Sequence, residues 1–415
     1  MLGPTPPSIE PAFEPSYADL LRVRGFARVA LGTLLARLGG QMLGIVLVLF
    51  VLQRYRSASL AGLAVLLSIL PGLIFSPIAG ALLDRQGRVR LMILDYAVTA
   101  GLTAVIIILS LAHQLPPPLL LLIVSVLGVS NILSITGTRS LFPLMLPRNL
   151  WDRANGLDSS LYSLTTVIGP AIAGVAVARF GPEGAFLVAA SVVGLAAASL
   201  IGVREPVDRA DSAGSLIGDA WAGLMYVVRH PSLRGLAITL FICNLGFGVL
   251  PVGIPVLVLR HLHGSAATVG QVFAVFGLAG LVTSLLIGRV DTEGRERLLI
   301  AGCIAIQTLA LALFAFANAL SMVFVLAAIA GSAESIVNVG LFALRQRRTD
   351  PALFGRAFAV SMALNFSGVP IGSAISGPLL EQSIAFPLLL GAAISVVAVV
   401  AAFVLIPAAA PAEAG

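Results

Sequence analysis

Long apolar runs alternate with short polar loops along almost the whole chain. A helix that crosses a lipid bilayer needs about 20 apolar residues. Runs of that length form two groups of six, separated by a polar stretch at 204–232. The runs are 27–52, 58–83, 91–113, 117–141, 155–179 and 183–203, and then 233–259, 266–288, 298–318, 320–344, 355–380 and 384–407. The pattern predicts an all-α membrane protein with twelve transmembrane helices in two six-helix bundles.

The polar segments predict the domain boundaries. We expect a Pro-rich tail over 1–24, an N-terminal bundle over 25–203, a linker over 204–232, a C-terminal bundle over 233–409 and a short tail over 410–415. The first tail lacks the basic start and apolar run of a cleavable signal peptide. Within the linker, Ser215 to Val228 has the pattern of an amphipathic helix on a membrane surface.

The composition supports a membrane protein and excludes several soluble classes. Hydrophobic residues make up 58% of the chain and charged residues 11%. Soluble domains carry about 25% charged residues, so this chain has too few charges to cover a water-facing surface. We therefore exclude a soluble enzyme, a nucleic-acid-binding protein and a disordered protein. No metal-ligand spacing is present, and the lack of Lys excludes a phosphate-binding loop of the ATPase type. We expect no cofactor.

The basic residues, all of them Arg, predict the orientation. Twenty of the 25 fall in loops on one side of the predicted spans and four on the other, with Arg37 inside a span. Basic loops face the cytoplasm in membrane proteins. This bias places both termini in the cytoplasm, and we expect a multi-pass protein of the bacterial inner membrane.

Two motifs recur in both halves. Asp84-x-x-Gly87-Arg88-x-Arg90 returns 207 residues later as Asp291-x-x-Gly294-Arg295-x-Arg297, and Gly169 and Gly174 return 203 residues later as Gly372 and Gly377. Such offsets predict two pseudo-symmetric halves. A substrate site is then expected between them, near the middle of the membrane.

The segment Gly80 to Arg90, GALLDRQGRVR, resembles the signature loop between helices 2 and 3 of the major facilitator superfamily. The resemblance implies that Gly80 allows close approach to the eleventh helix and that Asp84 interacts with the N-terminus of that helix. It also implies that Arg85, Arg88 and Arg90 tie neighbouring inner helix ends together. A carboxylate near a helix N-terminus is favourable because of the helix dipole.

Further segments resemble the exporters of that superfamily. IGPAIAG, Ile168 to Gly174, resembles their helix 5 motif through Gly169 and Pro170, although Ala173 replaces one of the paired glycines. Small residues at four-residue spacing also allow ordinary close packing of helices in lipid. The segments 139–157 and 355–360 resemble the macrolide-efflux and enterobactin-exporter subgroup. Run 117–141 lacks the deep Arg of many drug–proton antiporters, and 39–41 lacks the early acid of the subgroup, so neither template supplies the proton site.

Charges at membrane depth are functional candidates because they are costly there. Arg37 and Glu334 each lie roughly 15 Å from the inner end of a span, at 1.5 Å per residue. Glu334 is our candidate proton carrier, and Arg37 holds it ionised or binds an anionic substrate. Alternatively, Arg37 bonds helix-end carbonyls and Glu334 pairs with an inner-loop Arg.

Other polar residues inside the spans have a structural and a functional interpretation. Asp158 neutralises Arg153 or caps a helix, and is the next proton-carrier candidate after Glu334. Asp95, near the start of its span, is interpreted as a helix-terminus charge. Asn131, Asn244 and Asn338 bind substrate or join neighbouring helices.

We therefore expect a monomeric secondary active transporter, surrounded by lipid, whose partners are a small-molecule substrate and protons. The expected activity is export of a small amphipathic molecule, drug-like, macrolide-like or siderophore-like, by alternating access. The alternatives are a lipid or lysophospholipid flippase, a uniporter of the same fold, and a sensor or scaffold without transport. An enzyme is not expected, because no Ser/His, His/Asp or metal constellation lies at matched depth.

Overall fold

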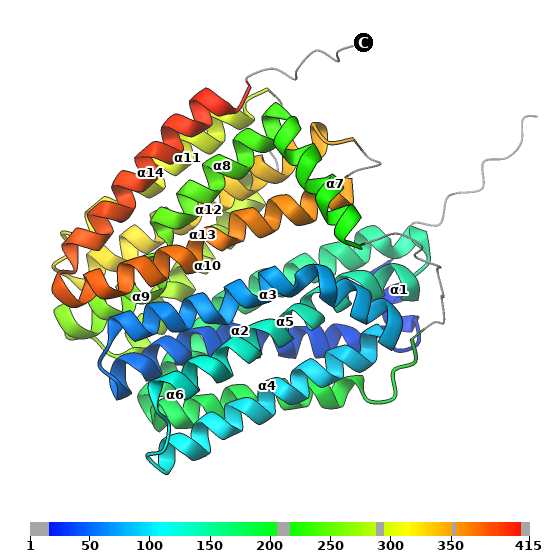
Figure 1. The fold of residues 1–415 in the computed structure, drawn as a ribbon, viewed down its shortest axis with the longest axis horizontal. Coiled ribbons are helices and arrows are strands. Elements are labelled where there is room, and N and C mark those ends of the chain that lie inside the picture. Colours follow the sequence, from blue (N-terminus) through cyan, green and yellow to red (C-terminus); the bar gives the residue numbers. More distant parts are fainter. Residues whose placement is uncertain (1–15, 206–215, 288–293, 351–353, 408–415) are drawn as a thin grey trace, which may run out of the picture.

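The computed structural model describes residues 16–205, 216–287, 294–350 and 354–407, which fold into long helices packed side by side (Figure 1). Within these ranges no strand occurs, so the predicted all-α class is confirmed. The long helices arise because their apolar side chains meet lipid or each other while every backbone polar group is satisfied inside its own helix.

The N-terminal half covers six crossings. Its elements are α1 (Tyr17–Arg22), α2 (Phe26–Arg54), α3 (Ala58–Gln86), α4 (Arg88–Leu111), α5 (Pro117–Met145), the short turn η1 (Arg148–Leu150) and α6 (Trp151–Leu200). The short α1 lies inside the predicted tail. Gly181, with φ 73° and ψ 173°, adopts a backbone conformation that glycine permits, and it divides α6 into crossings at 151–180 and 182–200.

The C-terminal half follows the linker helix α7 (Leu216–Arg229), which forms where the amphipathic stretch was predicted. Its elements are α8 (Pro231–Phe247), α9 (Leu250–Val256), the π-helical turn η2 (Leu257–His261), α10 (Ala266–Ile287), α11 (Glu296–Phe314), α12 (Leu320–Arg347), α13 (Phe354–Gln382) and α14 (Ala385–Leu405). The predicted run 233–259 is thus not one continuous helix. Pro251 and Pro255 lack the backbone N–H that a continuous helix needs, and the path breaks between α8 and α9.

The described residues contain ten segments long and apolar enough to cross a membrane. One of them, Arg148–Leu200, holds the two crossings separated at Gly181, and α13 is a further helix of 29 residues. The described chain therefore makes the twelve crossings expected from the sequence. Both of its ends lie on one side of the bundle together with α1 and α7; we call this side the inner end and the opposite side the outer end (Figure 1).

The two halves share an apolar core only toward the outer end. There, one cluster of buried side chains includes Val46 and Ala61 from the N-terminal half and Val252 and Leu380 from the C-terminal half. Toward the inner end each half has its own core, one containing Phe26, Met92 and Leu200, the other Leu236, Ile300 and Ile406. The halves meet mainly through α3 against α13 and α6 against α10.

Candidate substrate cavity and gating contacts

Two glycines of the repeated motif bring the backbones of the two halves into contact. A Cβ atom at Gly174 on α6 would lie 2.6 Å from the Ala266 carbonyl oxygen of α10, and one at Gly377 on α13 would lie 2.7 Å from the Ala58 carbonyl oxygen of α3. Neither position has room for a side chain. Small residues allow this approach, as they do in helix pairs within lipid generally.

The other two glycines of the repeat pack within their own halves. Gly169 lies against the Gln41 side chain of α2, and Gly372 lies against Gly248, the residue that ends α8. Pro170, which follows Gly169 on α6, also takes part in the contact between the halves, because its carbonyl oxygen faces Gly270 of α10. The repeat therefore has the same division of roles in both halves, one glycine for the inner packing of the half and one for the contact between halves.

Polar contacts also join the halves at the outer end. Glu381 Oε1 at the end of α13 accepts hydrogen bonds from the Ser57 hydroxyl (2.8 Å) and from the Ser59 backbone N–H at the start of α3 (3.0 Å). The Ser59 and Ser57 donors hold the pKa of the Glu381 carboxyl below its usual range. Nearby, Arg260 Nη2 donates to the Arg56 carbonyl oxygen at 2.9 Å.

At the inner end, α3 and α13 separate. No described atom lies within 4 Å of the position a Cβ would take at Gly80, so in this conformation Gly80 does not make the close approach to the eleventh helix that the family resemblance implies. The same two helices touch at their outer ends through Ala58 and Gly377. The halves therefore touch through α3 and α13 at the outer end, and at the inner end Gly80 makes no such contact.

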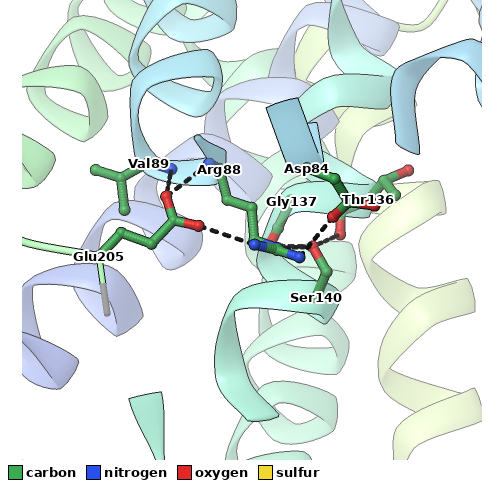
Figure 2. A network of polar contacts seen from close by, with 7 residues as sticks. All are labelled: Asp84, Arg88, Val89, Thr136, Gly137, Ser140 and Glu205. Atoms are coloured by element: carbon green, nitrogen blue, oxygen red, sulfur yellow. Dashed lines mark hydrogen bonds and ion pairs between the residues drawn. The ribbon is translucent and has the colours of Figure 1, made fainter. Parts of the chain in front are cut away.

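The signature loop is organised around Arg88 (Figure 2). Arg88 Nη2 pairs with Asp84 Oδ1 at 2.6 Å, Arg88 Nη1 pairs with Glu205 Oε1 at 3.0 Å, and Arg88 Nε donates to the Ser140 hydroxyl at 3.1 Å. In the described part of the chain, Asp84 thus forms its ion pair with Arg88 of the same loop. Three inner helix ends, those of α3, α5 and α6, converge on one guanidinium, as the resemblance implies for Arg88.

Glu205 was missed by sequence reasoning. It follows α6, and its Oε2 accepts hydrogen bonds from the backbone N–H groups of Arg88 (2.7 Å) and Val89 (3.3 Å) at the start of α4. A carboxylate at a helix N-terminus satisfies backbone donors and is favoured by the helix dipole. Gly87, with φ +91°, brings the carboxylate close, since a Cβ there would lie 3.3 Å from Glu205 Oε2.

The second copy of the loop is only partly described. Gly294 has φ +71°, as Gly87 has a positive φ, and Arg295 directly precedes α11. The predicted gating residue Asp291 lies outside the described residues. In the first copy, Arg85 and Arg90 are exposed, so the described loop uses Arg88 rather than all three arginines to join the helix ends.

Polar side chains from both halves lie between the halves at the middle of the bundle. Glu334 and Asn338 are one turn apart on α12, and both are exposed. The charge of Glu334 acts on the Tyr162 hydroxyl of α6 and on Cys243 of α8. Because Tyr162 belongs to the opposite half and is 51% exposed, Glu334 faces the space between the halves.

The partner of Arg37 differs from the predicted one. Arg37 on α2 pairs with Asp158 on α6: Nη1 lies 2.9 Å from Oδ1, Nη2 donates to Oδ2 at 3.0 Å, and Nη1 also donates to the Asp158 carbonyl oxygen. The guanidinium lies 5.6 Å from the centre of the Tyr162 ring. Arg37 is thus neutralised by Asp158, an acid of its own half, and not by Glu334.

The three asparagines have different surroundings. Asn131 on α5 and Asn338 on α12 are exposed within their spans. Asn244 on α8 donates to the Asn365 carbonyl oxygen at 3.1 Å and to the Asn365 side-chain oxygen on α13. In this conformation Asn244 joins two helices of the C-terminal half, while Asn131 and Asn338 have exposed side chains.

Comparisons with known proteins agree with this architecture. The model of the Major Facilitator Superfamily matches residues 29–252 and 236–415. The chain is 36% identical over 402 residues to the uncharacterized MFS-type transporter y4rN of Sinorhizobium fredii, covering 95% of this chain and 98% of the relative. It is 22% identical over 362 residues to macrolide efflux protein A of Streptococcus pyogenes, covering 85% and 88%. The crystal structure of a mutant of the nucleoside transporter NupG shares the fold, with a TM-score of 0.72, 14% identity, and coverage of 92% of this chain and 99% of that chain.

Proposed function

Because this chain belongs to the major facilitator superfamily, we propose that it exports a small amphipathic molecule in exchange for protons. We interpret the contacts between the halves at the outer end as those of an inward-facing conformation, which alternates with an outward-facing one. In each, the space around Glu334 opens to one side of the membrane. We further propose that the membrane is the bacterial inner membrane, with both termini in the cytoplasm, because basic loops concentrate at the inner end.

The exposed carboxyl of Glu334, facing Tyr162 while the outer end is closed, is the observation that carries this proposal. Within the described residues Glu334 forms no ion pair, because Arg37 is engaged by Asp158. An accessible carboxyl without a cation partner is able to take up and release a proton as its surroundings change. Ionisable residues facing a cavity inside the membrane mark ion and proton paths in transporters.

The chemistry beside Glu334 suits an amphipathic substrate. Tyr162 offers an aromatic face and a hydroxyl, and Asn338 offers both a hydrogen-bond donor and an acceptor. An aromatic face binds apolar groups, and the Glu334 carboxylate attracts a basic group on the same molecule. The similarity to macrolide efflux protein A supports the proposed direction of transport, which is export.

The experiment is transport of erythromycin, a macrolide with a basic amine, by purified protein in proteoliposomes with an imposed pH gradient. We expect uphill accumulation in wild type. Glu334→Gln, which mimics the permanently protonated state, should abolish uphill transport but retain downhill exchange. The matched control is Glu183→Gln, because Glu183 lies at the outer end of the N-terminal half and hydrogen-bonds Ser110. Uphill transport by Glu334→Gln would remove Glu334 from the proton pathway.

The same vesicles separate the alternatives. Flux of erythromycin that is indifferent to the pH gradient would identify a uniporter. Movement of a fluorescent lysophospholipid between leaflets, without erythromycin flux, would identify a lipid flippase. Absence of every flux, with the conformational change still present, would identify a sensor.

A further inference from the structure

A second acid lies inside the membrane-spanning region of the N-terminal half, away from Glu334. Asp95 is the eighth residue of α4, so it does not occupy the helix terminus expected from the sequence. Its side chain is 1% exposed. The carboxyl points to α5, where the Ser130 hydroxyl donates to Asp95 Oδ1 at 2.6 Å, and Thr99 of α4 lies 3.4 Å from the same oxygen.

No positive charge compensates this carboxyl within the described part of the chain. The groups that act on Asp95 are the hydroxyls of Ser130, Ser134 and Thr99 and a backbone group of Ser134. Of the charged groups on the surrounding helices, Arg37 of α2 pairs with Asp158 of α6, and Arg88 of α4 pairs with Asp84 of α3. The other arginines of α4 and α5, Arg90 and Arg139, are not among the groups that act on Asp95. The charge of Arg37 acts on the hydroxyls of Tyr96 and Tyr162 and is not among the groups that act on Asp95.

Burial without a cation favours the neutral form of an acid. Removing a carboxylate from water is costly unless a cation or several hydrogen bonds replace the lost hydration. The hydroxyls of Ser130 and Thr99, both at Asp95 Oδ1, replace only part of the lost hydration. The surroundings of Asp95 therefore suit a neutral carboxyl, in contrast to those of Asp158, which is paired with the guanidinium of Arg37.

A hydroxyl connects Asp95 to the exposed surface of α5. Ser130 is partly exposed, and the next residue, Asn131, is exposed. A hydroxyl both donates and accepts hydrogen bonds. When Asp95 releases its proton to Ser130 Oγ, the Ser130 hydroxyl passes its own proton to water beside Asn131. The reverse transfer reloads the acid, and no other atom changes bonds.

We propose that Asp95 is a second proton-binding residue of the transport cycle, loaded in the inward-facing conformation and reached through the Ser130 hydroxyl. The inference rests on the proposed proton coupling, and it adds a site in the N-terminal half to the one at Glu334 in the C-terminal half. Exchange of two protons for one substrate molecule becomes possible with two such sites.

The protonation state is tested without transport, by infrared spectroscopy of the full-length protein in lipid nanodiscs at neutral pH. A protonated carboxyl has a C=O stretching band separate from that of a carboxylate. Asp95→Asn should remove intensity equivalent to one such band. Asp158→Asn is the matched control, and it should leave the band unchanged because Asp158 forms an ion pair with Arg37. An unchanged band in Asp95→Asn would show that Asp95 is ionised and would overturn the proposal.

The role in the cycle is tested by erythromycin transport in proteoliposomes with an imposed pH gradient. Asp95→Asn keeps the shape and the acceptor for Ser130, so we expect wild-type levels of folded protein and normal downhill exchange. Uphill accumulation per unit pH gradient should fall by at least tenfold. Ser130→Ala, which keeps the acid and removes the relay, should slow uphill transport without changing its direction.

The outcomes separate this proposal from the proposed function. If wild type is driven by the pH gradient and Asp95→Asn is driven equally, Asp95 is a structural acid and only this inference fails. If wild type is not driven at all, proton coupling itself fails, and the inference fails with it. If Ser130→Ala transports uphill at the wild-type rate while Asp95→Asn loses uphill transport, only the relay through Ser130 is overturned, and Asp95 remains a proton-binding residue.

Discussion

The carboxylate of Glu381, at the end of α13, accepts a 3.0 Å hydrogen bond from the Ser59 backbone N–H in the first turn of α3. The two residues are 322 positions apart and belong to different halves. Ser57, the N-cap of α3, donates its hydroxyl to the same oxygen. An acid at a helix N-terminus thus holds the outer end closed, and the contact has to break whenever that end opens.

We predict that this contact makes the conformational equilibrium depend on pH. The hydrogen bonds lower the pKa of Glu381 in the closed form, whereas the open form leaves the carboxyl in water with an ordinary pKa. The contact therefore stabilises the inward-facing form above the ordinary pKa of about 4.3 and is lost as pH falls through the lowered value. Acid should open the outer end.

Spin labels on the exposed outer-loop residues Gln114 and Asn318 report this opening. Electron–electron distance measurements in nanodiscs should show a longer distance at acid pH in wild type. In Glu381→Gln the open population at pH 7 should rise about fivefold, for a loss of about 1 kcal/mol at an exposed charged hydrogen bond. An unchanged acid response in Glu381→Gln would assign the pH dependence to another group.

A second prediction concerns the glycine contact between the halves. Gly174→Leu places a side chain where even a Cβ would lie 2.6 Å from the Ala266 carbonyl oxygen. Overpacking costs typically about 1–3 kcal/mol, so the inward-facing form should lose about tenfold or more in population. The distance between labels at Gln114 and Asn318 should lengthen. Gly101→Leu is the control, because no described atom lies within 4 Å of a Cβ there, and equal effects of both variants would contradict the prediction.

A third prediction concerns Glu205. Glu205→Ala removes two backbone hydrogen bonds at the start of α4 and one partner of Arg88. Loss of a helix cap costs about 0.5–2 kcal/mol, so the temperature of heat-induced aggregation should fall by several degrees. Arg90→Ala changes an exposed residue of the same loop and should leave that temperature unchanged. A stable Glu205→Ala protein would show that water replaces the cap without loss.

A fourth prediction concerns orientation in the membrane. The native thiols Cys243 and Cys303 are buried and should react slowly. A cysteine at Pro117, which begins α5 at the outer end, should react with an impermeant maleimide added to intact cells. A cysteine at Gln86, at the inner end of α3, should react only after permeabilisation. The reverse pattern would place the termini outside the cell.

The element pattern was predictable because lipid imposes strong rules on helix length and apolar character. The crossings and the repeated glycines followed from local sequence and from the repeat, and the role of Arg88 followed from the resemblance of its loop to the family's signature loop. The pairing of Arg37 with Asp158 did not follow, because it depends on which faces of α2 and α6 meet across 121 residues. The depth of Arg37 along its span indicated Glu334 as its partner. The actual partner is Asp158, because the rotation of each helix about its axis determines which side chains face each other.

Two acids illustrate the same limit. Glu205 is one of several charges directly after a span, and only the fold shows that it reaches the start of α4. Asp95 is near the beginning of its apolar run, but α4 begins at Arg88, earlier than the run indicated. That shift of about one helical turn moves Asp95 from the end of a helix to the interior of the N-terminal half.

The touching backbones at Gly174 and Gly377 have a consequence for the energy balance of the cell. The membrane potential drives ions through any continuous file of water. A transporter without substrate must therefore keep such a file closed. Backbone-to-backbone contact at these two positions leaves no room for water between α6 and α10 at Gly174 or between α13 and α3 at Gly377. Larger residues at these two positions would hold the halves apart, and we expect each molecule then to leak protons and to dissipate the membrane potential even when no substrate is present.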